Sequence, residues 1–488
     1  MNSRLRFVLA AGAVLLSAGP AGAVIKLKLT IPKMYETARG VVVGTVTKVN
    51  ADNRVIDVKV TATLKGDPVG EQVRIQIVTP ADLIKQVAVD QPVVVLIAKA
   101  RGGPVNVLHL ADTWLLAEQI ADASPPAWRV VQTHNEQEPF PGRTAALVRA
   151  LEELKAGKST LLNAIEQNVF RGGVKELGNL KAKPTFFLAA DVNGDGKAEL
   201  LVGAADGVRL FAPSASGYED VTQAWGLAGA KGSWACFGDV NSDKTPDLLL
   251  GGALYLNDSK KFSPAKATFD IKPDPLAVGV VAGKDGKTAD IAALSKTGEL
   301  TVFENPGSVD KPWAAKPARS LWKDEAGTKP PFAAFFGDWG DNGKPHVMVV
   351  RENGVTRYAL DDDGGPPADL KRLTGRALGD TSTKEAQGMT LLGAIPLDLD
   401  GSGRMDLLLI TEKGGMALMN RGFGCYMVNP EASAAFRSHD QYKCPFVLKP
   451  TCFLAASDTQ DDKFDDVLVL TEDGSLFVVD NPPYQVNP

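Results

Sequence analysis

From residue 179 onward, short apolar runs alternate with acidic and glycine-rich turns. Typical runs are Leu200-Leu-Val-Gly203 and Val467-Leu-Val-Leu470, and a second apolar run such as Phe186-Phe-Leu-Ala-Ala190 precedes each acidic turn. Runs of this length, rich in Val, Leu and Phe and bounded by turn residues, are typical of buried strands. Asp-Gly and Asn-Gly pairs come after the apolar run that follows the acidic turn, and such pairs are typical of hairpin turns. The pattern predicts a repeated unit of strand, acidic loop, strand and hairpin.

This unit recurs often enough to define a fold. Four copies have an intact acidic loop, and two degenerate copies are recognisable at 282–294 and 338–350. A sheet of about three or four strands cannot bury both of its faces alone, so the copies are expected to pack radially as the blades of a closed β-propeller. We expect six or seven blades over residues 179–488, with a seventh blade or the closing strand supplied by a segment such as 171–183.

Residues 24–125 have a different pattern, in which apolar and polar residues alternate. The clearest stretches are 41–49, 55–64, 72–78 and 92–98. Alternation over such lengths predicts an antiparallel sheet with one buried face. We expect about five strands in a small β-barrel-like domain, which is similar to OB folds and to netrin-like modules.

Between the two β-regions, residues 126–178 show helical spacing of apolar residues. The stretches 144–154 and 161–170 repeat apolar residues at the period of an amphipathic helix. We interpret residues 126–178 as a linker with a short α-helical connector. The chain as a whole is predicted to be predominantly all-β.

The first 23 residues have the pattern of a cleavable secretory signal peptide. Arg4 and Arg6 precede the apolar stretch 7–16, and Ala21-Gly-Ala23 provides a small-residue cleavage site. We expect a secreted or periplasmic mature chain that starts near Val24 and has no transmembrane segment, because no later apolar run is long enough to span a bilayer. The net charge of −5, without runs of Lys and Arg, argues against a nucleic-acid partner.

The four intact acidic loops carry the candidate chemistry. Oxygen-bearing side chains fall at positions 1, 3, 5 and 9 of each loop, and turn-forming residues between them let the backbone curl around a hard cation that prefers about six to eight oxygens. Position 12, where an EF-hand has a bidentate Glu, is Val202 in the first loop. The pattern therefore predicts calcium loops between strands. Each loop has three carboxylates, which repel one another unless a divalent ion neutralises them.

These residues resemble FG-GAP/VCBS repeats, the propeller units of integrin α-chains and of many exported bacterial proteins. Residues 191–199 follow the consensus Asp-x-Asn-x-Asp-Gly-x-x-Asp almost throughout, and the resemblance covers about 300 residues. It implies a calcium ion between the first and second strands of a blade, held by side chains at positions 1, 3, 5 and 9 and by the carbonyl at position 7. The predicted ligands are Asp191, Asn193, Asp195, Lys197 and Glu199; Asp239, Asn241, Asp243, Thr245 and Asp247; Asp398, Asp400, Ser402, Arg404 and Asp406; and Asp458, Gln460, Asp462, Phe464 and Asp466.

The two degenerate copies have lost ligands. Val281 occupies the first position of one, and Gly340 and His346 replace ligands in the other. We therefore expect about four structural calcium sites.

The four cysteines leave two interpretations open. Cys425 and Cys444 bracket a segment without strong strand signals, and an exported chain can join such a pair in a disulfide bond. Alternatively the thiols are free and buried, since Cys236 and Cys452 lie in apolar strands.

No recognisable catalytic motif accompanies the acidic loops. The four histidines form no HExxH motif, and no serine lies in Gly-x-Ser-x-Gly. Ions caged between strands lack the open position that metal catalysis needs, so the calcium is expected to be structural. We expect a non-catalytic adhesion or scaffold module that binds a protein or carbohydrate ligand on the propeller rim.

Two alternatives to this function remain open. One is a polysaccharide lyase or hydrolase with its site in the propeller channel, because carboxylates are plentiful enough for an acid–base pair. The other treats residues 24–125 as a metalloprotease inhibitor. The known inhibitors of that type present an N-terminal cysteine, whereas the mature chain expected here starts with Val24.

Overall fold

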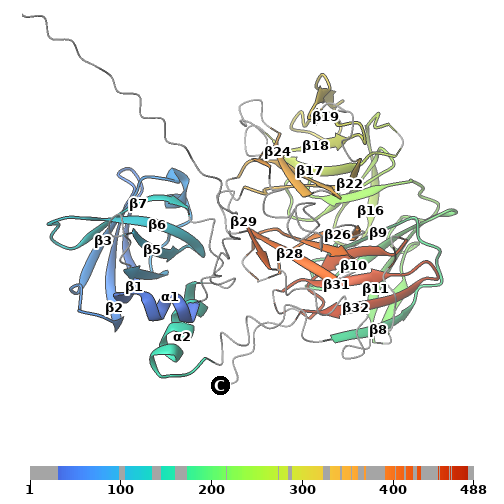
Figure 1. Cartoon of the computed structure of the whole chain (residues 1–488). Coiled ribbons are helices and arrows are strands. Elements are labelled where there is room, and N and C mark those ends of the chain that lie inside the picture. Colours follow the sequence, from blue (N-terminus) through green and yellow to red (C-terminus); the bar gives the residue numbers. More distant parts are fainter. Residues whose placement is uncertain are drawn as a thin grey trace, which may run out of the picture.

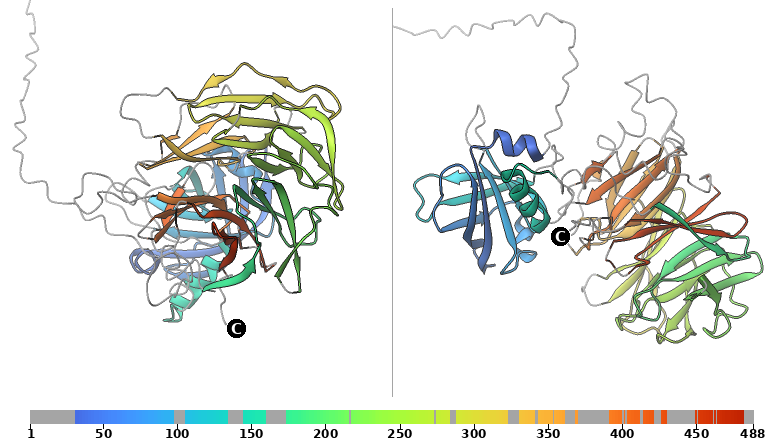
Figure 2. Two further views of the ribbon diagram at one scale, coloured as in Figure 1. Left: turned by 90° about the vertical axis from the view of Figure 1, so that its right-hand side faces the viewer. Right: turned by 90° about the horizontal axis from the view of Figure 1, so that it is seen from below.

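The computed structural model contains a closed β-barrel and a six-bladed β-propeller (Figures 1 and 2). The residues that the structure describes are 31–97, 105–133, 144–159, 173–215, 217–272, 274–283, 288–322, 330–340, 343–352, 354–360, 368–369, 391–399, 401, 403–411, 414–420, 426–429, 449, 451–460, 462 and 464–481. None of the helices among them is long and apolar enough to cross a bilayer.

Seven strands form the barrel, joined in the order β1-β2-β3-β7-β6-β5-β4 and closed by pairing of β4 with β1. They are β1 (Gly40–Asn50), β2 (Val55–Lys65), β3 (Gln72–Ile77), β4 (Pro92–Ile97), β5 (Val105–Leu110), β6 (Thr113–Ile120) and β7 (Ala127–Thr133). Only β3 and β7 pair in parallel among these neighbours. The predicted small barrel is confirmed, with seven strands where the sequence indicated about five.

The barrel has an inner core and an outer apolar layer. Val42 and Val46 of β1 face the interior, where they pack in one cluster with Trp128 of β7. Val41 and Val43 face outward, because successive residues of a strand point to opposite faces. They pack against the apolar residues of two helices, α1 (Ile31–Thr37) and α2 (Thr144–Lys155).

The helix α2 coincides with the predicted helical stretch 144–154, whereas 161–170 lies outside the described residues. A short 3-10 helix, η1 (Ala81–Lys85), connects β3 to β4.

Each propeller blade is an antiparallel sheet, and blades one to five are built from consecutive strands. Blades one to three comprise β9 (Phe186–Ala190), β10 (Glu199–Ala204), β11 (Gly207–Ser214) and β12 (Gly217–Asp220); β13 (Ala235–Gly238), β14 (Asp247–Leu250), β15 (Ala253–Asn257) and β16 (Phe262–Thr268); and β17 (Ala277–Ala282), β18 (Ala289–Leu294), β19 (Glu299–Glu304), β20 (Ala314–Ala315) and β21 (Arg319–Ser320). Blades four to six comprise β22 (Pro331–Gly337), β23 (His346–Arg351), β24 (Gly354–Ala359) and β25 (Ala368–Asp369); β26 (Leu391–Leu397), β27 (Asp406–Thr411), β28 (Gly414–Asn420) and β29 (Tyr426–Asn429); and β30 (Phe453–Ser457), β31 (Asp466–Leu470), β32 (Ser475–Asp480) and β8 (Gly173–Asn179).

The ring is closed by β8, which precedes blade one in sequence but is the outer strand of blade six. It pairs antiparallel with β32, in a register that places Val174 opposite Val479. The prediction of a closing strand within 171–183 is thus confirmed, and the blade number is six. The barrel strand β7 and the propeller strand β8 both come from the segment 126–178.

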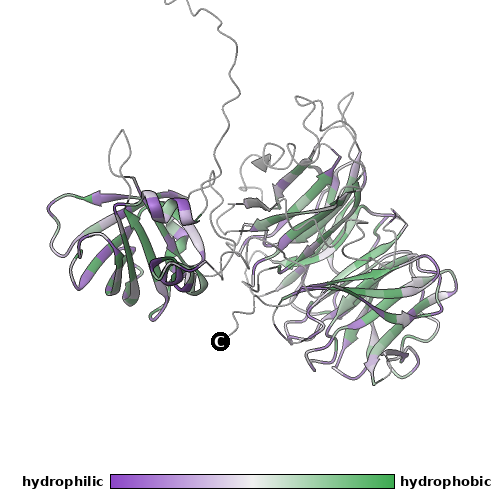
Figure 3. Cartoon of the chain, turned by 60° about the horizontal axis from the view of Figure 1, so that its bottom comes forward, coloured by the Kyte–Doolittle hydropathy of each residue, from purple (hydrophilic) through white to green (hydrophobic). Residues whose placement is uncertain are grey.

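Six apolar cores hold the blades together, and each is shared by two neighbouring blades. Leu201 of blade one packs in one cluster with Leu248 of blade two, and Leu200 packs on the other side with Leu468 of blade six. The other four junctions have equivalent clusters. Apolar residues concentrate in the strands and polar residues in the connecting loops (Figure 3). Each blade therefore buries both faces only because its neighbours are present.

Cys236, in β13, is a buried free thiol, and burial raises the pKa of this thiol to about 12. Cys452 is half-buried and directly precedes β30. Cys425 and Cys444 lie outside the described residues, so their pairing stays a prediction.

Candidate metal centres

The four acidic loops occupy the same place in their blades, between the first and the second strand. We name them loop one (191–199), loop two (239–247), loop five (398–406) and loop six (458–466), after their blades. The ninth residue of each loop is the first residue of the second strand: Glu199 of β10, Asp247 of β14, Asp406 of β27 and Asp466 of β31. The strands on either side are those that the apolar runs predict.

In loop one, the side chains at positions 1, 3 and 5 turn inward over the backbone. The Asp191 carboxylate accepts hydrogen bonds from the backbone N–H groups of Gly194 (2.7 Å), Asp195 (3.1 Å) and Gly196 (2.9 Å). Asn193 Oδ1 accepts from Asp195 N–H (2.7 Å), and Asp195 Oδ1 accepts from Lys197 N–H (2.9 Å). This winding brings the predicted ligand side chains to the inside of one tight turn.

Loop two repeats this winding with a different sequence. Asp239 accepts from the N–H groups of Asp243 (3.1 Å) and Lys244 (2.8 Å), Asn241 accepts from Asp243 N–H (3.0 Å), and Asp243 accepts from Thr245 N–H (2.8 Å). The two loops therefore share one backbone geometry, which is a property of the spacing of the acids.

Loops five and six retain parts of the same network. Asp398 Oδ2 accepts from Gly403 N–H (2.6 Å). Asp458 Oδ1 accepts from the N–H groups of Gln460 and Asp462 (both 3.1 Å), and Asp462 Oδ1 accepts from Phe464 N–H (3.0 Å). Asp400 and Ser402 lie outside the described residues.

The ninth residue of each loop is a buried carboxyl group. Glu199 and Asp406 are 0% exposed, and Asp247 and Asp466 are 1% exposed. One oxygen of each accepts the backbone N–H of the second loop residue. These residues are Val192 (3.0 Å), Val240 (3.0 Å), Leu399 (3.1 Å) and Thr459 (3.2 Å).

Burial makes the charge on these carboxyl groups unfavourable. Burial, together with the nearby charges of Asp195 and Asp191, raises the pKa of Glu199 to about 7. Burial likewise raises the pKa of Asp247 to about 6 and that of Asp466 to about 6. A buried carboxylate close to other carboxylates is stabilised by a cation, since both causes act against its charged form.

The residues of loops one and two fit a hard divalent cation. Their side-chain donors are all oxygens, which calcium prefers. In the described part of the chain, no Lys or Arg side chain forms an ion pair with any of the six carboxylates of these two loops. Within the same residues, no three His, Cys, Asp or Glu side chains already converge as a metal-binding group. The oxygens instead accept backbone N–H groups, so calcium ligation stays a prediction.

Blades three and four differ from the others in the connection between their first and second strands. In blade three, Asp290 keeps the position of the ninth residue at 6% exposure. In blade four, His346 takes that position, and the fully buried Trp339 fills the turn and donates its indole N–H to the Phe335 carbonyl (2.8 Å). Trp339 is the second residue of this connection, where the other loops have Val192, Val240, Leu399 and Thr459. Asp338 keeps the first position, and its Oδ2 accepts the Gly343 N–H (2.6 Å).

The structure also shows a set of bridging asparagines that sequence reasoning missed. Asn257, Asn305 and Asn481 lie at or just after the end of the third strand of blades two, three and six. Each donates its side-chain amide to a carbonyl in the preceding blade, at 2.7, 2.9 and 3.1 Å respectively. The sequence does contain a pattern that could have identified them: an Asn recurs 10 to 15 residues after the ninth loop residue.

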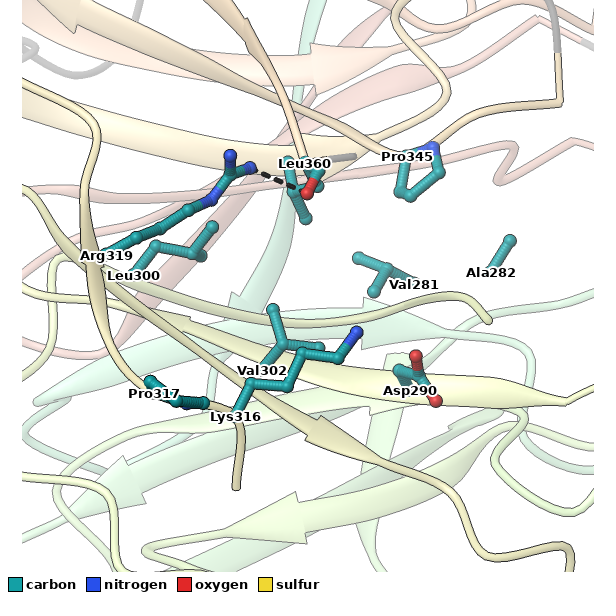
Figure 4. A pocket seen from close by; sticks show the side chains of 10 residues that line it. All are labelled: Val281, Ala282, Asp290, Leu300, Val302, Lys316, Pro317, Arg319, Pro345 and Leu360. Atoms are coloured by element: carbon teal, nitrogen blue, oxygen red, sulfur yellow. Dashed lines mark hydrogen bonds between the residues drawn. The ribbon is translucent and has the colours of Figure 1, made fainter. Parts of the chain in front are cut away.

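A cavity of about 200 Å³ lies between blades three and four (Figure 4). Its lining includes Asp290 and Lys316 from blade three and Leu360 from blade four. Arg319 reaches across it and donates to the Leu360 carbonyl at 2.6 Å. Lys316 is paired with Glu304 at 2.7 Å. Asp290 is the one carboxylate among the described residues that line this cavity.

The seventh residue of loop five contacts the barrel. The half-buried Arg404 donates from Nη2 to the Ala111 carbonyl (2.8 Å) and to Gln86 Oε1 (3.3 Å). Its carbonyl is the predicted calcium ligand, while its side chain joins the two folded parts.

Comparison with known proteins agrees with this architecture. Residues 191–250, which contain loops one and two, match the FG-GAP-like repeat. The resemblance indicated by the sequence is thereby confirmed: the chain contains a six-bladed β-propeller with an FG-GAP-like repeat. No curated protein is similar to this chain at a significant level.

Solved structures give only distant likenesses. A Tc holotoxin pore of Photorhabdus luminescens is 14% identical with a TM-score of 0.43, over 80% of this chain and 18% of that chain. A lectin of Agrocybe aegerita that recognises non-reducing terminal N-acetylglucosamine is 16% identical with a TM-score of 0.40, over 61% and 74%. The WD40 domain of SCAP from fission yeast is 12% identical with a TM-score of 0.30, over 50% and 55%. At these scores none of them bears on function.

Proposed function

We propose that this protein is an exported, non-catalytic binding or scaffold module whose propeller is stabilised by calcium in loops one, two, five and six. The observation that carries the calcium assignment is the buried carboxyl group at the ninth position. Glu199 is fully buried within reach of two further carboxylates, and no cationic side chain of the described residues pairs with it. A calcium ion would supply the positive charge that this arrangement lacks.

In loops one and two, the oxygens at positions 1, 3, 5 and 9 and the carbonyl of Lys197 or Thr245 would hold the ion. The chain's own contribution is to fix the turn. The Asp191 carboxylate accepts the N–H groups of positions 4 to 6, and the Asp239 carboxylate accepts those of positions 5 and 6, which sets the curvature before an ion arrives. Export is supported by the signal-peptide pattern of residues 1–23.

The proposed ligand surface is the propeller edge that carries the acidic loops. Loops five and six adjoin there, since Asp465 N–H donates to the Asp398 carbonyl (3.0 Å) and Asp398 N–H donates to Asp465 Oδ2 (2.7 Å). Loops five and six therefore form one continuous polar surface. A protein or carbohydrate ligand is proposed for it because such a rim presents many hydrogen-bonding groups in a fixed arrangement.

The calcium assignment is tested by melting the full mature chain in chelator and in millimolar calcium. Binding at one site stabilises the fold by about 2.7 kcal/mol when free calcium is about 100 times Kd, so the melting temperature should rise by several degrees. Asp195→Asn and Asp243→Asn should each reduce this rise. Equal melting temperatures in the two buffers would exclude calcium stabilisation.

The absence of catalysis is tested by incubating the calcium-loaded protein with a panel of polysaccharides. A binding module retains a polysaccharide or captures a protein without changing it. Release of shorter or unsaturated products would instead favour the alternative, a polysaccharide lyase or hydrolase.

A further inference from the structure

The bridging asparagines connect each acidic loop to the loop of the neighbouring blade. Asn257 of blade two donates Nδ2 to the Val192 carbonyl of loop one (2.7 Å) and to the Pro246 carbonyl of loop two (3.1 Å). Its own backbone N–H donates to Asp247 Oδ1 (2.8 Å). A single residue thus contacts both loops, and it is 3% exposed, so water does not compete for these bonds.

Asn481 makes the same three contacts between blades five and six. Its Nδ2 donates to the Leu399 carbonyl of loop five (3.1 Å) and to the Asp465 carbonyl of loop six (3.1 Å). Its backbone N–H donates to Asp466 Oδ1 (2.8 Å), and it is 2% exposed. The arrangement therefore recurs at a second junction of the ring, between blades five and six.

The acceptor peptide in each preceding loop is itself held by the ninth-position carboxylate. Val192 receives Asn257 on its carbonyl, while its N–H donates to Glu199 Oε2 (3.0 Å). Leu399 receives Asn481 on its carbonyl, while its N–H donates to Asp406 Oδ2 (3.1 Å). The ninth-position carboxylates of neighbouring loops are therefore linked through one peptide and one asparagine.

This chain of hydrogen bonds is interrupted elsewhere in the ring. Asn305 extends it from Val240 of loop two to Asp290 of blade three. Beyond blade three, the residue that directly follows the third strand of blade four is Leu360, which has no side-chain amide and lines the cavity of Figure 4. The strand β11 of blade one contains no asparagine. Loops one and two therefore form one linked pair, and loops five and six form another.

We propose that Asn257 and Asn481 couple calcium binding within these two pairs of loops, so that an ion in one loop raises the affinity of its neighbour. This inference rests on the proposed calcium function. An ion that fixes the Glu199 carboxylate fixes the Val192 peptide, and that peptide orients Asn257 and, through it, Asp247. Couplings between sites commonly change affinity about 5- to 150-fold and are reciprocal.

The test measures calcium-dependent protection of loop one from hydrogen exchange, in the full mature chain, as calcium is titrated. Asp243→Asn disables loop two without touching loop one. With Asn257 present, this substitution should raise the calcium midpoint of loop one about five-fold or more. In the Asn257→Ala background, or in Asn257→Ser if the alanine variant does not fold, Asp243→Asn should leave the midpoint of loop one unchanged.

Asn481→Ala is the matched control, because it removes the same kinds of contact from the other pair of loops. It should preserve the effect of Asp243→Asn on loop one and remove the coupling between loops five and six. An unchanged loop-one midpoint after Asp243→Asn in the native background would overturn the coupling while calcium binding stands. If no loop gains protection at any calcium concentration, the proposed calcium function fails and the coupling fails with it.

Discussion

Loops one and two place different residues in the same left-handed backbone conformation. Loop one uses Gly194 and Gly196, with φ of 79° and 83°, whereas loop two uses Ser242 and Lys244, with φ of 64° and 73°. Residues with a Cβ atom are strained in this conformation by roughly 1–2 kcal/mol, and glycine is not. The shared geometry of the acids is therefore maintained in loop two against a local strain.

We predict that exchanging the residues at position 4 changes stability in opposite directions. A Cβ atom at Gly194 would meet nothing within 4 Å, so Gly194→Ser has only a conformational effect. It should lower the free energy of unfolding by about 0.5–1 kcal/mol, and Ser242→Gly should raise it by a similar or smaller amount. Denaturant unfolding of the full chain in chelator measures both. Shifts of the same sign would contradict the argument.

The ninth-position carboxyl groups predict how the metal-free protein responds to pH. Burial raises the pKa of Glu199 from 4.5 to about 7. A group whose folded pKa lies above its unfolded pKa stabilises the fold fully below the unfolded value, and this contribution is lost as pH rises through the folded value. Metal-free propeller should therefore lose stability between about pH 4.5 and 7.

This loss is measured by melting metal-depleted protein across that pH range. Added calcium binds the ionised carboxylate and should reduce the loss. Glu199→Gln cannot ionise and should flatten the metal-free profile, whereas an unchanged profile would show that Glu199 is not its source.

At the scale of single elements, blade four shows a loop that combines one acid, Asp338, with a buried indole. The fully buried Trp339 packs in a core shared with blade five, and its carbonyl accepts the Tyr426 hydroxyl. Trp339→Ala should lower the free energy of unfolding by about 3–5 kcal/mol, equally in calcium and in chelator, because it leaves a cavity. Asp239→Ala, which removes a predicted ligand from loop two, should destabilise the protein in calcium far more than in chelator. A calcium-dependent effect of Trp339→Ala would refute this distinction.

Elements encoded by nearby residues could be predicted, and those that depend on distant partners could not. The strands around each acidic loop were predictable because a buried strand is a local apolar run. The barrel strand β5 was less visible, because Asn106 interrupts its apolar pattern although it is fully buried. The strand β7 follows Pro125 and Pro126, and it pairs in parallel with β3, which is distant in the sequence. For these reasons its residues fall within the linker predicted from the sequence.

The same distinction holds for the candidate site. The spacing of the acids identified the loops, because the turn is formed by residues within nine positions of one another. Asn257 acts on Val192 in another blade, and a single sequence does not show that the two residues meet. The inter-blade contacts therefore had to come from the structure.

At the scale of the whole molecule, Arg404 is a link between the propeller and the barrel. Its guanidinium donates to Ala111 and Gln86 of the barrel. Arg404→Ala should widen the range of relative orientations and increase the radius of gyration measured by small-angle X-ray scattering. The melting temperature should change little, because these hydrogen bonds join the two folded parts and lie outside the apolar core of either part. Lys197→Ala, at the same position of loop one, is the control and should leave the scattering unchanged.

The pairing of β8 with β32 has a consequence for biosynthesis. The strand β8 emerges from the ribosome before the other described propeller strands, and its sheet partner in the described part of the chain is β32, which ends at Asp480. Until translation reaches residue 480, β8 must wait without this partner and blade one has no sixth blade to pack against. Nascent chains that stop short of this point should therefore remain protease-sensitive at both ends of the propeller, and the ring should close only after residue 480 has left the ribosome.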